Sequence, residues 1–183
     1  MKQFFSVKKL ALLGVLLALN VVLGYYSIHT LDMKIGFAFV TLACAAALFG
    51  PVEAALIGAL GDVLGFVVNP IGMFFPGYTI TAALTGLVFG LFLRRKITWP
   101  KLLLAVAINQ FLLGLCLNTF FIAFQIMGGV SGIWPTILGL LPKRALQAVI
   151  LFVVQTLVIW IMDKALFPLL RRFTEGKDAD GNP

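Results

Sequence analysis

Long apolar runs, separated only by short polar breaks, are the feature that most limits what this sequence can fold into. Of its 183 residues, 61% are hydrophobic and 11% are charged, and the mean hydropathy is +1.07. An average soluble domain contains roughly 25% charged residues, so this chain could not cover a water-exposed surface with polar groups. A helix needs about 20 apolar residues to cross a bilayer, and the runs therefore predict six membrane-spanning helices.

The predicted fold is an all-α integral membrane protein, with one domain over residues 1–173 and a polar tail over 174–183 that is expected to be disordered. Gly50-Pro51 separates the second and third runs, because proline ends one helix and is tolerated in the first turn of the next. Two prolines and two glycines between Asn69 and Tyr78 predict a break there. The expected helices span about 9–27, 35–49, 52–68, 78–94, 101–127 and 144–167.

The distribution of basic residues predicts the orientation of the chain. The net charge is +7, but the 14 Lys and Arg residues lie at the ends of apolar runs, so we expect a membrane protein without a nucleic-acid partner. With six spans, eleven of these residues fall on the side of the two termini, and the positive-inside rule places that side in the cytoplasm. An odd number of spans would divide them seven against seven. The three bases on the outer side are Lys34, Lys143 and Arg144.

The sequence offers little for catalysis. The single histidine, His29, lies in the first outward connection, and no serine has the G-x-S-x-G context of a hydrolase nucleophile. Neither an H-E-x-x-H zinc helix nor a P-loop is present, so any ATP-driven process requires a partner. Cys44 and Cys116 lie inside apolar runs, where a thiol behaves as a small buried hydrophobe, and we expect no metal or cofactor.

Asp62 is the most informative polar residue, because an ionised side chain deep in a bilayer is costly. Glycines at 58, 61 and 65 share its helix face and would let a neighbouring helix approach the carboxylate. Three roles remain open: a hydrogen bond that holds a neighbouring loop, direct contact with a ligand, and proton coupling in a secondary transporter. Proton coupling would need a second carboxylate at similar depth to relay the proton, but Glu53 and Asp163 lie toward the cytoplasmic ends of their helices.

Two further sets of residues are candidates for contacts. Phe74, Phe75 and Tyr78 cluster in the third connection, where aromatic rings either pack against the spans or stack on a ligand. Asn118 and Gln125, on the outer half of the fifth span, are expected to line a cavity. On the first span, Ala11, Gly14 and Ala18 form a face of small residues suited to close helix packing, either within this chain or with a partner.

Several strings in the correct order resemble one family, the substrate-binding S components of energy-coupling factor (ECF) vitamin transporters, and within it the folate group. The resemblance covers most of residues 9–95 and continues more thinly beyond. The matching strings are Ala18 to Leu23, Lys34 to Phe39, Leu48 to Pro51, Gly58 to Gly65, Asn69 to Thr79, and Leu141 to Lys143.

This resemblance implies a six-helix protein in the plasma membrane of a prokaryote that captures a water-soluble vitamin and performs no catalysis. It also implies partners, namely a transmembrane coupling protein, contacted through Ala11, Gly14 and Ala18, and two ATPases. Connections 28–34 and 69–78 would gate the binding cavity. The implied substrate-binding residues are Lys34, Phe37, Asp62, Asn69, Phe75, Gly77, Tyr78, Thr79, Asn118, Lys143 and Arg144.

The resemblance favours folate as substrate, but this sequence departs from the folate group at several basic positions. Gly24-Tyr25 replaces an arginine after the first helix, and Leu146-Gln147 replaces a Lys-Asn pair near the last one. Fewer cations would then surround the ligand, which makes a monoanion such as pantothenate the alternative.

Overall fold

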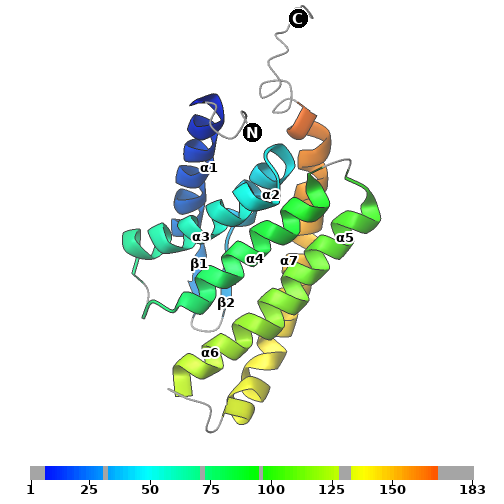
Figure 1. Ribbon diagram of the computed structural model, residues 1–183. Coiled ribbons are helices and arrows are strands. Elements are labelled where there is room, and N and C mark those ends of the chain that lie inside the picture. The colour runs from blue at the N-terminus through cyan, green and yellow to red at the C-terminus, as the bar shows by residue number, and fades with distance from the viewer. Residues whose placement is uncertain (1–6, 31–32, 71–72, 95–96, 128–132, 169–183) are drawn as a thin grey trace, which may run out of the picture.

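The computed structural model describes residues 7–30, 33–70, 73–94, 97–127 and 133–168, which form a helical bundle (Figure 1). The expected tail over 174–183 lies outside the described residues. The helices are α1 (Val7–Tyr25), α2 (Ala38–Leu48), α3 (Pro51–Val68), α4 (Pro76–Leu93), α5 (Trp99–Ala107), α6 (Asn118–Met127) and α7 (Ile133–Ala165), with the π-helical stretch η1 (Ile108–Leu117) joining α5 to α6.

Because α5, η1 and α6 form one uninterrupted helical run, the described helices amount to the six that the sequence predicts. Four runs are long and apolar enough to cross a membrane, namely Pro51–Val68, Pro76–Leu93, Trp99–Met127 and Ile133–Ala165. Lys9–Tyr25 and Ala38–Leu48 are shorter apolar helices. The start of α1 and the end of α7 lie at the same end of the bundle, as an even number of crossings requires (Figure 1).

The last helix is longer than expected, because it begins at Ile133 instead of near 144. Pro135 lies in the first helical turn, where the backbone N–H would have no partner within the helix. Pro142 lies inside the helix and was wrongly interpreted as part of a connection. Lys143 and Arg144 therefore project from the body of α7, not from a loop.

A short hairpin, β1 (Ile28–Thr30) and β2 (Met33–Ile35), occupies the connection between α1 and α2. The strands are antiparallel, with His29 opposite Lys34. No strand was predicted here and the second helix was predicted to begin at 35, whereas α2 begins at Ala38. Alternating strand periodicity cannot be recognised in segments of three residues each.

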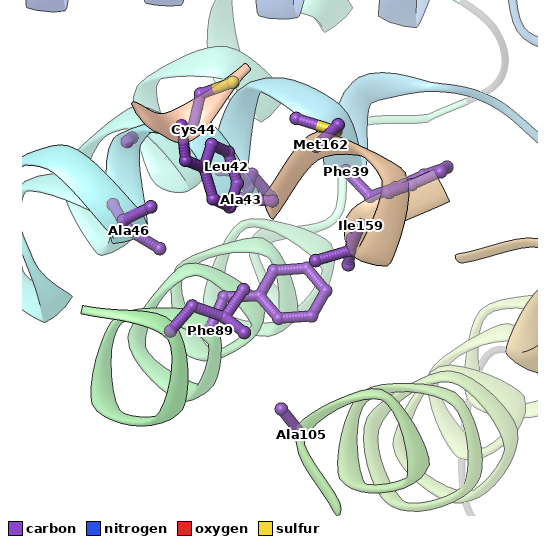
Figure 2. Packing of buried hydrophobic residues seen from close by; sticks show 14 of the residues in the cluster. Phe39, Leu42, Ala43, Cys44, Ala46, Phe89, Ala105, Ile159 and Met162 are labelled. Atoms are coloured by element: carbon purple, nitrogen blue, oxygen red, sulfur yellow. The ribbon is translucent and has the colours of Figure 1, made fainter. Parts of the chain in front are cut away.

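The hydrophobic core forms around α2, whose residues from Thr41 to Ala47 are all buried. Figure 2 shows Phe39, Leu42 and Ala43 of α2 facing Phe89 of α4 and Ile159 of α7. Small side chains on α2 allow the surrounding helices to approach it closely. Cys44 is buried here as expected, whereas Cys116 is exposed and not buried, because it lies on the outer face of η1.

Helices α3 and α4 pack backbone to backbone through glycines. A Cβ atom at Gly58 would collide with the Ala82 carbonyl, and one at Gly86 would collide with the Ala54 carbonyl. The glycines beside Asp62 were predicted to face one neighbouring helix, but they do not. Gly61 faces Asn20 of α1, and Gly65 has open space beside it. Only Gly58 of that series brings α4 close.

The substitution Gly86→Ala is expected to lower the thermal unfolding midpoint, because its methyl group must push α3 and α4 apart. Overpacking of this kind costs about 1–3 kcal/mol. Gly65→Ala is the matched control, since nothing lies within 4 Å of its added methyl group. Scanning fluorimetry in detergent measures both midpoints, and equal midpoints would contradict the close packing.

Candidate functional site

The predicted binding residues that come together lie where the start of α4 meets α3, α6 and α7. The aromatic cluster consists of Phe75, the N-cap residue of α4, and Tyr78 of α4, together with Phe121 and Phe124 of α6. Phe75 lies with its ring centroid 5.3 Å from that of Phe121, 6.2 Å from that of Phe124 and 5.6 Å from that of Tyr78. Gly77 is buried beneath Phe75 and Phe121, with no room for a side chain.

The two phenylalanine rings of the third connection, Phe74 and Phe75, pack against different helices. Phe74 packs on Phe66 of α3 with centroids 5.2 Å apart, while Phe75 turns toward α6. Both aromatic side chains thus pack against the spans, as one of the two predicted interpretations requires. Phe74 remains 43% exposed and Phe75 is half-buried, so this packing leaves ring surface available for stacking.

Gln125 of α6 connects this cluster to the preceding loop. The Tyr78 hydroxyl donates a hydrogen bond to Gln125 Oε1 over 3.0 Å, and Gln125 Nε2 donates to the Met73 carbonyl over 3.1 Å. One amide side chain therefore holds the α3–α4 connection against α6. A gate formed by this connection would have to break the Gln125–Met73 bond in order to open.

Asp62 accepts a hydrogen bond from the Thr79 hydroxyl at 2.7 Å, which joins the middle of α3 to the first turns of α4. Both residues were predicted as binding residues, and the structure places them in direct contact. This bond matches one of the three roles that the sequence left open for Asp62, a hydrogen bond that holds a neighbouring segment.

Arg144 is the outer-side base whose surroundings are best defined. It is half-buried on α7, and its Nη2 donates to the Gly114 carbonyl of η1 at 3.2 Å. Arg144 and Asp62 are both close enough to act electrostatically on the Tyr78 hydroxyl. A cation, a carboxylate and the aromatic cluster therefore share one region. A π-helix such as η1 often marks a functional site.

The remaining predicted binding residues are more dispersed. Phe37 is the exposed N-cap residue of α2, and Asn69 ends α3, with its N–H donating to the Gly65 carbonyl. Lys143 is exposed on α7, and Lys34 belongs to β2. Asn118 begins α6, and its buried Oδ1 has no hydrogen-bond partner among the described residues.

Phe121 and Phe124 were not predicted as partners of the third connection. Together with Phe120 and Gln125 they follow the three- and four-residue spacing of one helix face, which was the available signal. Asn20 of α1 makes interhelical hydrogen bonds: its Nδ2 donates to Thr41 Oγ1 at 2.6 Å and to the Ala38 carbonyl at 3.1 Å. These bonds fix the start of α2 against α1.

The face of small residues on α1 is open. Ala11, Gly14 and Ala18 are all exposed, and an added Cβ at Gly14 would meet nothing within 4 Å. The opposite side of α1 packs on the core through Leu13, Leu16 and Leu17. Packing of this face within the chain, which the sequence left open as an alternative, is therefore wrong for the described residues.

The profile of the family described as "ECF-type riboflavin transporter, S component" matches residues 4–164. The chain therefore belongs to the ECF S components. The S component is 34% identical over 137 residues to the folate transporter FolT of Clostridium novyi (strain NT), covering 74% of this chain and 76% of that protein. It is 32% identical over 151 residues to FolT of Leuconostoc mesenteroides, covering 81% and 80%.

The solved structures agree with this assignment. A crystal structure of FolT bound with folic acid superposes on the S component with a TM-score of 0.76 and 28% sequence identity, covering 87% of this chain and 94% of that one. The S component is thus a multi-pass membrane transport protein, with the six-helix architecture that the sequence predicted.

Proposed function

We propose that this S component binds folate from outside the cell and presents it for import across the plasma membrane of a prokaryote. The observation that carries the proposal is the region shared by the aromatic cluster, Arg144 and Asp62, in a chain similar to FolT bound with folic acid. Folate has a flat pterin ring for aromatic stacking and carboxylates for a guanidinium.

Charge supports an orientation in which both termini are cytoplasmic, since the bases near the start of α1 and the end of α7 belong to the larger group. At this end Lys164 lies over Trp160 at 4.7 Å, and Trp160 pairs with Trp99 at 5.0 Å, an arrangement typical of a membrane interface. The aromatic cluster then lies in the outward half.

Energy for import is expected to come from partners, because the sequence has no phosphate-binding loop. We assign this role to a transmembrane coupling protein and two ATPases. The open face of α1, with Ala11, Gly14 and Ala18, is the contact that we propose for the coupling protein.

Other ligands fit the region less well. Riboflavin, named in the family description, offers a flat ring but no carboxylate for Arg144. Pantothenate offers a carboxylate but no ring for the aromatic cluster. Proton coupling through Asp62 would need a second carboxylate at similar depth for relay, and Glu53 and Asp163 lie toward the cytoplasmic ends of their helices.

The proposal is tested by calorimetric titration of the purified chain with folate, pantothenate and riboflavin. We expect folate to bind most tightly, and Phe75→Ala to weaken folate binding by about three- to tenfold through lost ring contacts while leaving pantothenate unaffected. Tight binding of pantothenate or riboflavin without heat from folate would overturn the substrate assignment. Folate accumulation by the chain alone in liposomes would overturn the capture role.

A further inference from the structure

Helix α1 is attached to the rest of the bundle along one narrow face. Among its described side chains, only that of Asn20 is buried. Large apolar side chains around the remainder of the helix are exposed, for example Val15 at 57% and Leu19 at 46%. Helix α1 therefore lies at the edge of the bundle, as Figure 1 also shows, and its setting depends on few contacts.

The residues that attach α1 share one side of the helix, which we call the anchoring face. Its members are Lys9, Leu13, Leu16, Leu17 and Asn20. At about 100° per residue they fall within an arc of about 100°, and the open face of α1 is centred about 140° away from them. Any rotation of α1 on the bundle would therefore turn the open face by the same angle.

Apolar contacts alone do not fix this rotation in a membrane. Lipid tails are as apolar as leucine, so the three leucines of the anchoring face can exchange helix contacts for lipid contacts at modest cost. The hydrocarbon region offers no substitute for a polar partner. The rotation of α1 therefore depends on Lys9 and Asn20, the polar residues at the two ends of the anchoring face.

These two residues hold α1 at different levels of the bundle. Lys9 Nζ pairs with Glu53 Oε1 of α3 at 2.5 Å, with the two side chains 22% and 15% exposed, and it lies 5.8 Å from the ring centroid of Phe49. Asn20 bonds the start of α2 and faces Gly61, farther along α3. Helices α1 and α3 thus run in the same direction and meet at both levels, on either side of the open face along the helix.

The Lys9–Glu53 ion pair is the contact at the N-terminal end of the open face, two residues before Ala11. Glu53 lies in the first turn of α3, where the helix dipole favours a negative charge. Loss of one charge from a partly buried pair leaves the other uncompensated, which disrupts more than the loss of an apolar contact. The pair is therefore suited to hold α1 in one rotation.

We propose that Lys9 and Glu53 are positioning residues for the partner: their ion pair sets the rotation of α1 and so directs the open face toward the transmembrane coupling protein. The inference rests on the contact with that protein given under the proposed function. Both residues lie at the opposite end of the bundle from the aromatic cluster, so ligand binding by the chain alone should not depend on them.

Charge reversal tests the pair. Lys9→Glu and Glu53→Lys each bring like charges together, whereas the double variant restores a pair of opposite charges. Each single substitution should weaken binding to the complex of coupling protein and ATPases by at least about fivefold, and the double variant should stay within about threefold of wild type. Titration of the fluorescently labelled complex with the full chain measures these affinities.

Lys101→Glu is the matched control for charge reversal. Lys101 is exposed on α5, which packs against α4 and α7. This variant should bind the complex as wild type does. Folate affinity, measured by calorimetry on the chain alone, should change less than about twofold in all four variants.

Double electron–electron resonance on the chain alone reports the rotation of α1 without the partner. Nitroxides attached through Gly14→Cys and Leu157→Cys, in a Cys116→Ser background, place one label on the open face and one on the exposed side of α7. Cys44 is buried and remains unlabelled. The distance distribution should shift or broaden in each single variant, return in the double variant and be unchanged in Lys101→Glu.

Loss of partner binding together with an altered label distance, both restored in the double variant, would support the positioning role. Unchanged label distances in the single variants, absence of rescue, or loss of folate affinity alongside partner binding would overturn it and leave the capture function standing. A wild-type chain that binds folate but not the complex would overturn the partner contact and this inference together. A wild-type chain that does not bind folate would overturn the proposed function, while the label distances would still decide whether the ion pair sets α1.

Discussion

Replacing Arg144 with Met is expected to weaken folate binding by about ten- to a hundredfold. Charge-assisted hydrogen bonds contribute about 1.5–3 kcal/mol, and this half-buried guanidinium is close enough to act electrostatically on the Tyr78 hydroxyl. Met keeps the length and apolar stem of the side chain, so loss of affinity reports mainly on the charge. Calorimetric titration of wild type and variant with folate measures the difference.

Arg94→Met is the matched control for charge removal. Arg94 is exposed, it lies at the opposite end of the bundle, and its side chain packs over Gly50. Affinity for folate should stay within about twofold of wild type in this variant. A similar loss in both variants would show that net charge, and not a local contact, governs binding.

Lys143→Met distinguishes the contributions of the two neighbouring bases on α7 to folate binding. Lys143 is exposed whereas Arg144 is half-buried, and a charge in high dielectric contributes less to binding. We therefore expect the effect of Arg144→Met to exceed that of Lys143→Met. Unchanged affinity in both variants and in Lys34→Met would mean that backbone amides and neutral side chains hold the carboxylates.

The double substitution of Gly14 and Ala18 by Leu is expected to abolish co-purification with the coupling protein while folate binding survives. Two Leu side chains on the open face of α1 prevent a partner helix from approaching the backbone. They meet no neighbour in this chain at Gly14, so the fold should be unaffected. Affinity pull-down of the complex, with calorimetry on the isolated chain, measures both properties.

Gly24→Leu is the control on the same helix. Nothing lies within 4 Å of an added Cβ at Gly24, but the residue is near the opposite end of α1 from Ala11 and Gly14. This variant should assemble normally. Loss of folate binding with intact assembly in the double variant would contradict the assignment of this face as the partner surface.

Apolar run length and charge position determined the number of helices and their arrangement as a membrane bundle. The helix number and the membrane arrangement both follow from the free energy of moving side chains from water into the bilayer. That free energy depends on the composition of each segment and hardly on its neighbours in space. The break at Gly50-Pro51 was also predicted from the sequence. In the structure Gly50 has a φ of 116°, which favours glycine, and Pro51 is the first residue of α3. The order of local strings was sufficient to identify the family.

Tertiary structure decided how polar groups find partners. The pairing of Asp62 with Thr79 and the bridge from Gln125 to Tyr78 and Met73 join residues far apart along the chain. Similarly, the glycines at 58, 61 and 65 look equivalent in sequence, yet they face α4, α1 and open space respectively. Pro142 does not end α7, since packing along a long helix outweighs one lost backbone hydrogen bond. Such outcomes depend on which helices become neighbours, and only the assembled bundle fixes that.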